Sequence, residues 1–172
     1  QLCSEAEIAV REGCKHLILS GKKISEKNAA IPMILAFGAI NSKLVNLGIR
    51  GFASINVQTG EVLDTHSFAV LLGIGATIIN PYLVFDSIYQ RYEKKLFGKF
   101  SYAECIQRYI KSVDNGLLKI MSKMGISVLS SYRGGCNFET VGLSRAIVAE
   151  YFPGMISRIS GIGIFGIQKK IK

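Results

Sequence analysis

The sequence predicts an α/β fold in which parallel strands alternate with helices. Over the first hundred residues, helical and strand-like patterns follow one another in the order helix, strand, helix, strand, helix, strand, helix. The segment 76–79 is a short continuous apolar run, which is typical of a strand buried on both faces of a parallel sheet. The composition agrees, because 172 residues with 49% hydrophobic side chains suffice for one domain and exclude a disordered chain.

The predicted elements of this first part begin and end at recognisable signals. Ser4 and Glu7 have the spacing of a capping box, which predicts the start of the first helix, and Gly13 predicts its end. Pro32 suits the first turn of the second helix, and Asn80 suits the N-cap of the fourth. The expected helices cover 5–12, 31–47, 65–72 and 81–96, the expected strands cover 16–20, 51–57 and 76–79, and a polar loop covers 21–30.

The most regular periodicity in the chain predicts an amphipathic helix over 102–124. At about 100° per residue its apolar side chains gather on one side, and only Leu118 lies outside that side. The opposite side carries four basic residues: Arg108, Lys111, Lys119 and Lys123. This basic side is either a solvated surface or a contact with another domain or an anion.

The last part of the chain is less regular. The apolar segment 126–129 predicts a further strand, followed by a loop of small residues over 130–135. Ser144 suits the N-cap of a final helix that reaches about Phe152, where a Pro-Gly pair ends it. The tail 159–172 is interrupted by glycines and ends with basic residues.

Charge is unevenly distributed along the chain. The net charge is +9, from 21 basic minus 12 acidic side chains. Residues 1–86 hold seven of each sign, so the whole excess lies in 87–172, with fourteen basic and five acidic side chains. This asymmetry indicates an anionic partner, a surface for another domain, or no function. Nucleic acid is the weaker interpretation, because aromatic residues are not interleaved with the basic ones and no known binding motif occurs.

Several kinds of site lack the necessary spacing. The four cysteines and two histidines form no zinc or haem motif, and we expect the cysteines to be reduced thiols in the cytoplasm. The apolar run 68–79 is shorter than the roughly 20 residues of a membrane helix. Gly161, Gly163 and Gly166 spell GxGxxG, but only six residues follow and none is acidic, so they predict no dinucleotide site.

The loop that contains Ser131, Arg133 and Gly134 is the most site-like segment. A glycine-rich backbone with an arginine can hold an anion. In α/β folds, sites form at the carboxyl ends of strands. We therefore expect Asn80 and Tyr82, together with Ser20, Gly21 and Lys22, to lie on the same face as this loop. The alternative is a tight turn whose arginine contacts another domain.

His66 is a further candidate, but its neighbours do not complete a catalytic group. Asp64 is two residues away and points elsewhere on a helix or turn. We therefore expect His66 to lie at a helix N-terminus or in the core. Glu139 and Glu150 are the only acids after Asp114, and no pair of carboxylates is set by spacing for acid–base chemistry.

Five stretches, taken together in their order and spacing, carry a resemblance to a known family. They are GIGATIINPYL at 73–83, KIMSKMGIS at 119–127, SYRGGCNFE at 131–139, VGL at 141–143 and SRISGIG at 157–163. With them, nearly the whole chain resembles the central domain of the large (alpha) subunit of glutamate synthase.

The resemblance implies both a fold and a role. The fold is a rudimentary, incomplete (β/α)8 TIM-barrel-like domain related to the FMN-linked oxidoreductase barrels. The family enzyme makes glutamate from glutamine and 2-oxoglutarate, with ammonia released in an amidotransferase domain and used in a domain that carries FMN and an iron–sulfur cluster. The implied role of this segment is to connect those two partner domains and to wall part of the ammonia channel. It implies no catalytic, cofactor-binding or metal residue here, and no membrane.

The resemblance also suggests boundaries. We expect a family-like part over 1–158 and a divergent basic tail over 159–172. The chain begins with Gln1 and its tail departs from the family pattern, so we expect the product of a split or decaying gene, or an isolated fragment, inactive alone. An incomplete barrel would leave sheet edges and apolar faces uncovered, so we expect self-association or poor solubility.

Two alternatives to the glutamate synthase role remain open. The first is a self-standing α/β module that holds a phosphate or another anion in the Ser131–Gly135 loop. The second is a basic domain associated with nucleic acid.

Overall fold

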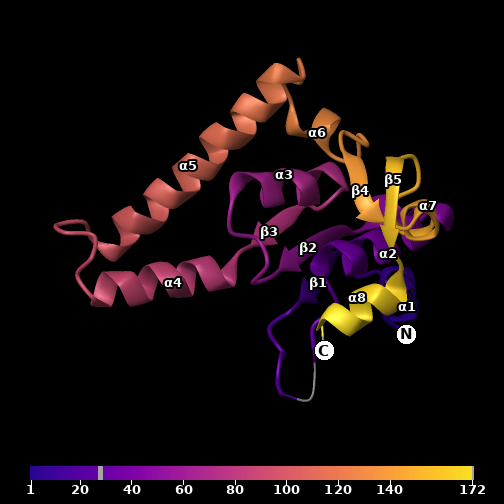
Figure 1. Cartoon of the computed structure of the whole chain (residues 1–172), viewed down its shortest axis with the longest axis horizontal. Helices are drawn as coiled ribbons and strands as arrows, with labels where there is room; N and C mark the ends of the chain where they lie inside the picture. Colours follow the sequence, from indigo (N-terminus) through magenta and orange to yellow (C-terminus); the bar gives the residue numbers. More distant parts are fainter. Residues whose placement is uncertain (27–28, 172) are drawn as a thin grey trace.

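A computed structural model describes residues 1–26 and 29–171, and it divides into three parts (Figure 1). The body contains α1 (Leu2–Arg11), β1 (His16–Ser20), α2 (Met33–Asn46), a 3-10 turn η1 (Arg50–Phe52), β2 (Ser54–Gln58), α3 (Thr65–Gly73) and β3 (Ile78–Asn80). The arm consists of α4 (Tyr82–Glu93) and α5 (Tyr102–Lys123). The end unit contains α6 (Leu129–Tyr132), β4 (Glu139–Leu143), α7 (Arg145–Tyr151), β5 (Ile156–Ile162) and α8 (Ile164–Ile171).

The body is built on a parallel sheet whose strands pair in chain order, β1-β2-β3. Ile55 and Val57 of the central strand are fully buried and belong to the same core as Phe37 and Leu44 of α2. The helices between the strands thus cover one face of the sheet. The alternation of helices and parallel strands predicted for the first hundred residues is confirmed.

Three local predictions for the first hundred residues are wrong. Asn80 is the last residue of β3, and the N-cap of α4 is Pro81, which makes no side-chain capping hydrogen bond. Residues 50–52 form the turn η1, so β2 begins at Ser54 and not at position 51. The first helix begins at Leu2 with Gln1 as its N-cap, so Ser4 lies inside the helix and forms no capping box with Glu7. Gln1 Nε2 instead donates a hydrogen bond to Glu5 Oε1 at 3.0 Å. In the expected loop over 21–30, residues 27 and 28 lie outside the described residues, as does residue 172 of the expected tail.

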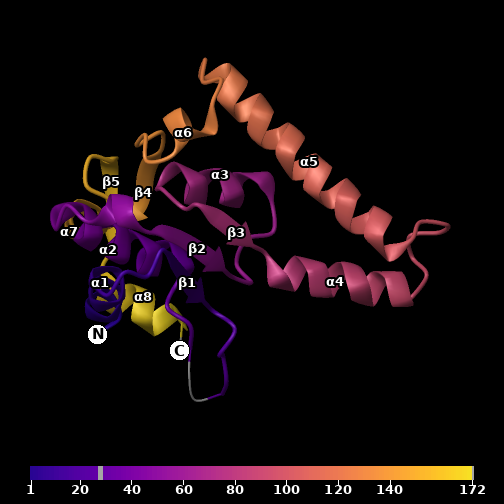
Figure 2. The same cartoon turned by 180° about the vertical axis from the view of Figure 1, so that it is seen from behind.

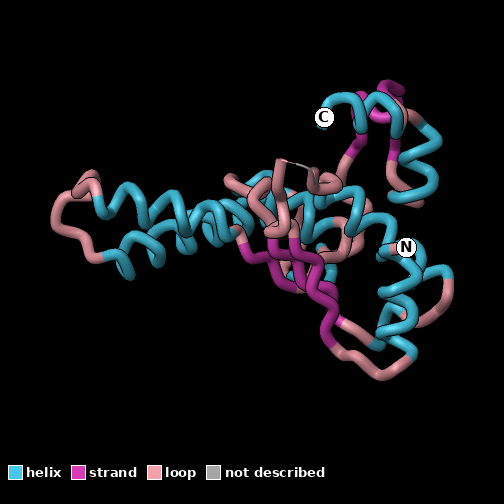
Figure 3. The backbone as a smooth tube through the Cα atoms, turned by 90° about the horizontal axis from the view of Figure 1, so that it is seen from below, coloured by secondary structure: helices cyan, strands magenta, loops and turns pink. Residues whose placement is uncertain are grey.

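The arm is a helical hairpin whose two helices meet at a distant tip and diverge toward the body (Figures 1 and 2). Seen from below, the same hairpin again extends far beyond the sheet (Figure 3). A capping box between Ser101 and Glu104 starts α5. Aromatic pairs hold the helices together, including Phe85 with Tyr109 and Tyr89 with Tyr102. The predicted helix over 102–124 is confirmed, and its four basic side chains are exposed.

The end unit holds a second parallel sheet, in which β4 pairs with β5 across α7. Its register shifts twice along five residues of β4, and the backbones of Gly142 and Gly161 contact each other there. A side chain at position 161 would collide with that backbone, so only glycine fits. The predicted cap at Ser144 is confirmed, since its hydroxyl accepts a hydrogen bond from Ile147 N at 3.4 Å.

The strand predicted over 126–129 is wrong. The amide of Ile126 donates to the carbonyl of Met121 at 3.0 Å, which closes the end of α5. Ile126 packs beside Ala69, Leu72 and Tyr132, and the chain then forms the single turn of α6. The apolar run therefore anchors a helix end against α3 instead of joining a sheet.

A close helix–helix contact attaches the end unit to the body. An added Cβ at Gly38 of α2 would lie 2.6 Å from the Phe152 ring and 2.8 Å from the Tyr151 carbonyl oxygen. Ser42 Oγ donates a hydrogen bond to that same carbonyl at 3.1 Å. The small residues of α2 thus allow the C-terminal end of α7 to approach it closely.

The structure confirms the α/β class, with described strands arranged in a three-stranded and a two-stranded parallel sheet. Within residues 1–26 and 29–171, no helix combines the length and the apolar character that crossing a membrane requires.

Candidate functional site

The carboxyl edge of the body sheet gathers several of the residues singled out in the sequence. Asn80 pairs in register with Gln58, whose Oε1 accepts a hydrogen bond from Ser20 Oγ at 2.7 Å. Tyr82 lies beside them, with its hydroxyl 3.5 Å from the Gly21 carbonyl oxygen. Lys22 Nζ lies 5.0 Å from the centre of the Tyr82 ring. The structure therefore brings Asn80 and Tyr82 together with residues 20–22, as the parallel topology predicts.

The open face of this sheet carries a ladder of polar and apolar side chains. In the central row, Ile18, Asn56 and Ile78 lie side by side, and the two isoleucines are 69% and 56% exposed. The Asn56 Oδ1 atom is buried and has no hydrogen-bond partner among the described residues. In the next row, His16 Nδ1 lies 2.7 Å from Ser54 Oγ. This face therefore combines exposed apolar area with a covered acceptor that has no partner among the described residues.

The loop with Arg133 and Gly134 lies at the opposite, amino edge of the body sheet. It lines a cavity of about 520 Å³ together with the chain segments just before β2 and β3 and the end of α2. In Figure 1 the body strands point toward the arm, while the end unit lies on the other side. Arg133 is therefore separated from Asn80 and Tyr82 by the length of the sheet. The expectation that its loop shares their face is wrong, because the loop follows the helical turn α6 and not a strand. Ser131 is exposed on α6 and does not line this cavity.

Arg50, which is not among the residues predicted from the sequence, lies in the same cavity. Its Nε donates to Asn41 Oδ1 at 2.7 Å, and its two terminal nitrogens donate to the carbonyl oxygens of Ala53 at 2.7 Å and Gly75 at 2.9 Å. Burial lowers the pKa of the Arg50 guanidinium, and the positive charge of Arg133 lowers it further. A single arginine between a helix end and a strand gives no motif, so only the fold reveals this arrangement.

His66 lies exposed in the first turn of α3, where its ring packs edge-on against Phe138 at 6.2 Å between centroids. Asp64 does not orient it. That carboxylate caps α3, because its Oδ1 accepts from Ser67 N at 2.9 Å and from Ser67 Oγ at 2.6 Å. The hydrogen bonds from Ser67 lower the pKa of Asp64. The arrangement is that of a helix cap, with His66 at a helix N-terminus as expected.

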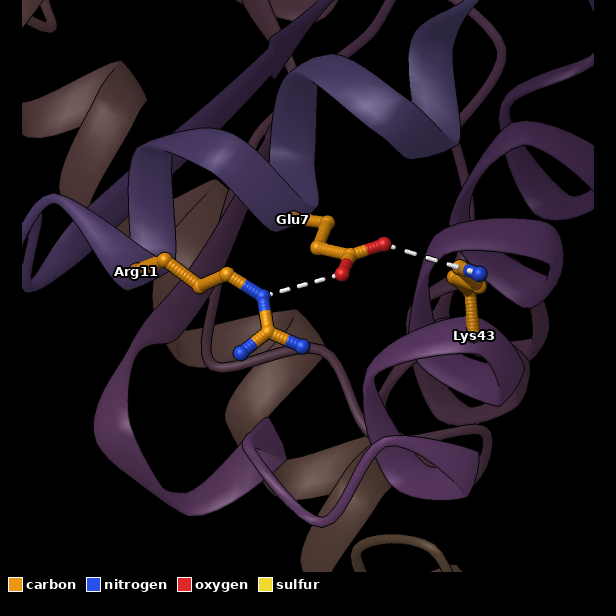
Figure 4. Close-up of polar contacts among 3 residues, drawn as sticks. All are labelled: Glu7, Arg11 and Lys43. Carbon is orange, nitrogen blue, oxygen red and sulfur yellow. Dashed lines mark hydrogen bonds and ion pairs between the residues drawn. The ribbon is translucent and has the colours of Figure 1, made fainter.

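A three-residue ion-pair group joins α1 to α2 (Figure 4). The carboxylate of Glu7 accepts a hydrogen bond from Arg11 Nε at 2.9 Å and lies 3.5 Å from Lys43 Nζ. The hydrogen bond from Arg11, together with the charge of Lys43, lowers the pKa of Glu7 below its ordinary value of 4.5. Each charge of this group has a partner, which is typical of a structural contact between helices.

The remaining chemical motifs have structural explanations. Gly161 and Gly163 lie at the end of β5, immediately before α8, and Gly161 is needed for the contact with Gly142. Among the described residues, no three His, Cys, Asp or Glu side chains gather closely enough to hold a metal ion.

These features define an α/β segment of two parallel sheets with an exposed sheet face at one place and an arginine-lined cavity at another. The family model described as "Glutamate synthase central domain" matches residues 1–144. The chain belongs to the glutamate synthase central domain family, as the resemblance of its motifs indicates.

Individual relatives agree with this membership. The chain is 56% identical over 167 residues to the glutamate synthase [NADPH] large chain of Azospirillum brasilense, which covers 97% of this chain and 11% of that protein. It is 42% identical over 167 residues to the corresponding large chain of Bacillus subtilis, with the same coverage. It is 40% identical over 181 residues to the ferredoxin-dependent glutamate synthase of Pyropia yezoensis, covering 99% of this chain and 12% of that protein. The chain thus spans about a ninth of these relatives.

Proposed function

We propose that this chain serves as a segment of a glutamate synthase, where it connects the amidotransferase domain to the FMN-binding domain. The observation that carries the proposal is the 56% identity with a glutamate synthase large chain over 97% of this chain. Because the matching part is only 11% of that relative, the segment works as one part of a larger enzyme.

The open face of the body sheet supports a contact with the rest of such an enzyme. Ile18 and Ile78 expose large apolar side chains in the middle of this face, and Asn56 Oδ1 between them lacks a partner among the described residues. A buried acceptor without a hydrogen bond costs roughly 1–3 kcal/mol. A neighbouring domain would cover the isoleucines, and a donor from that domain, a water molecule or a passing ammonia molecule would satisfy the amide. This face is our candidate for the wall of the ammonia channel.

The topology supports kinship with the (β/α)8 barrels. In such barrels, each parallel strand is joined by a helix to the strand next to it. The body repeats this arrangement over β1, β2 and β3. We propose that the body is the remainder of a barrel, and that its open face corresponds to the former barrel interior. The boundary at 158/159 remains part of the proposal, with β5 extending from Ile156 to Ile162 across it.

The experiment places this chain in a working enzyme. The matching segment of the Azospirillum brasilense large chain is replaced by this chain, and glutamate formation is measured with glutamine and, separately, with added ammonia. The substitution Ile18→Trp then enlarges a side chain on the open face. A channel wall predicts a several-fold loss of glutamine-dependent synthesis while ammonia-dependent synthesis is retained, because only the former needs passage between the sites.

The matched control is Ile159→Trp in the end unit, where the isoleucine is also exposed, at 61%. It should leave both activities unchanged. An equal loss of both activities by Ile18→Trp, or no loss, would overturn the channel-wall role. The connecting role is tested by the purified chain alone, which should show no glutamine- and 2-oxoglutarate-dependent NADPH oxidation. Turnover by this chain alone would refute it.

A further inference from the structure

The cavity at the amino edge of the body sheet holds two guanidinium groups and no acidic lining residue among the described part of the chain. Arg50 comes from the turn before β2, and Arg133 comes from the loop after α6. The remaining wall is formed by small, polar and apolar residues, among them Asn41, Val45 and Phe52. Two cations from segments far apart in the sequence thus border one space of about 520 Å³.

Arg50 is held rigidly but its charge is not neutralised. Its three hydrogen bonds, at 2.7, 2.7 and 2.9 Å, all go to neutral oxygens of Asn41, Ala53 and Gly75. A guanidinium has five N–H donors, so two remain after these contacts. Gly75 holds a positive φ of 116°, which lets its carbonyl oxygen accept from Arg50 where most residues would be strained. The fold therefore fixes a half-buried cation with spare donors.

Arg133 adds a second charge to the same space. None of the three ion pairs among the described residues includes Arg133 or Arg50. The two like charges raise each other's electrostatic energy, and the partial burial of Arg50 increases that cost. An anion between them would attract both guanidinium groups and so offset their mutual repulsion.

We propose that Arg50 and Arg133 form a binding site for a carboxylate at the amino edge of the body sheet. A carboxylate can accept two parallel hydrogen bonds from the planar fork of a guanidinium, and the fixed orientation of Arg50 prepares this contact. The apolar side chains of Val45 and Phe52, which are 53% and 63% exposed, suit the carbon chain of a short organic acid better than a bare phosphate. This site is independent of the connecting role proposed above, because it lies at the other edge of the sheet.

The carboxylate can come from a free organic acid or from an acidic side chain of a neighbouring domain. We test the free ligand first, with the purified 172-residue chain and glutarate as the probe, by isothermal titration calorimetry. Arg133→Gln removes one charge without breaking any of the Arg50 hydrogen bonds. It should weaken glutarate binding by at least about tenfold, the effect of losing a charged hydrogen bond. Inorganic phosphate should bind more weakly than glutarate.

Arg91→Gln is the matched control, since it removes the same charge from the exposed surface of α4. It should leave glutarate binding unchanged, and Arg133→Lys should lie between wild type and Arg133→Gln because it keeps the charge without the fork. Circular dichroism checks that each variant is folded. Binding of glutarate that is equal in wild type and Arg133→Gln would overturn the proposal.

A carboxylate from a neighbouring domain gives a different pattern. In the chimera with the Azospirillum brasilense chain, such a side chain would occupy the site and exclude glutarate. Arg133→Gln would then lower the melting temperature of the chimera, whereas Arg91→Gln would not. If the purified chain does not bind glutarate and the two substitutions affect the chimera equally, the site is refuted for both sources.

Discussion

The two parallel sheets of this chain differ sharply in what surrounds them. In the body sheet, Ile55 and Val57 are fully buried, and the strands pair without a shift in register. In the end unit, no residue of β5 is buried, Ile159 is 61% exposed, and the register shifts twice. Parallel pairing by itself therefore does not make a core. A core forms where helices cover a face of the sheet. Among the described strands, only those of the body sheet have buried residues under such helices.

The comparison predicts that the same substitution, isoleucine to alanine in the middle of a strand, lowers the free energy of unfolding much more in the body sheet than in the end unit. Ile55→Ala should lower the free energy of unfolding by roughly 2–5 kcal/mol, because it opens a cavity in the body core. Ile159→Ala should cost less than about 1 kcal/mol, because its side chain is mostly in solvent and only strand preference is lost. Urea unfolding followed by circular dichroism measures both. Similar costs would show that β5 is buried in solution, against the structure.

The next largest effect on stability is expected where α2 of the body packs against the end of α7. Gly38→Ala should destabilise the chain by roughly 1–3 kcal/mol, because the added methyl group collides with Phe152 and the Tyr151 carbonyl. This outweighs the gain of about 1 kcal/mol that alanine normally brings to a helix. Gly51→Ala is the control, since nothing lies within 4 Å of its added methyl group. A stabilised Gly38→Ala variant would mean that α7 does not pack on α2 as described.

The start of α5 provides a smaller test, because it lies far from the body, whereas the later part of α5 packs against the body through Val113 and Met121. Ser101→Ala removes the side chain that caps α5 and should cost about 1 kcal/mol. Hydrogen exchange should show faster opening in the first turns of α5, with the body sheet unaffected. Ser112→Ala, at an exposed position within the same helix, should not increase exchange. Uniformly faster exchange in both sheets would contradict a local effect of this cap.

The smallest expected effect concerns the ion-pair group on the body. The folded pKa of Glu7 lies below its ordinary value of 4.5, so its contribution is present above that value and is lost as pH falls through the folded pKa. The stability difference between wild type and Glu7→Gln should therefore shrink between pH 7 and pH 3, as measured by urea midpoints. Lys43→Met should reduce the pH dependence only in part, because Arg11 remains. A constant difference across this range would exclude the ion pairs as its cause.

The sequence predicts the body well because its signals are local. Gly13 and Pro32 mark helix ends, and the apolar runs between such signals have the right lengths for strands and helices. In the end unit the helix after Ser144 was predicted, but the strands were not, because glycines interrupt the alternation of β4 and β5 and neither strand has a buried face. The segment 126–129 was misassigned because an apolar run predicts burial without specifying a partner, which here is α3.

The positions of the candidate residues were likewise predictable only where they depend on local signals and strand order. Asn80 and Tyr82 could be placed beside residues 20–22, since the ends of neighbouring parallel strands must meet at one edge. Arg133 was expected on that same face, and this prediction is wrong, because its position depends on α6 packing against α3 and not on the end of a strand of the body sheet. Arg50 was missed because its hydrogen-bond acceptors come from three separate segments that no spacing rule connects.

The contact between α2 and the chain after α7 also has a consequence for the growing polypeptide. Ser42 and Tyr151, which share a hydrogen bond, are 109 residues apart. At the usual speed of synthesis, a ribosome needs about 5 to 20 seconds to add that many residues. During this interval the surface of α2 around Gly38 has no cover from its own chain. Until then, the face of α2 around Gly38 lacks the residues that cover it in the folded chain, and the core that includes Val148 and Phe152 stays incomplete.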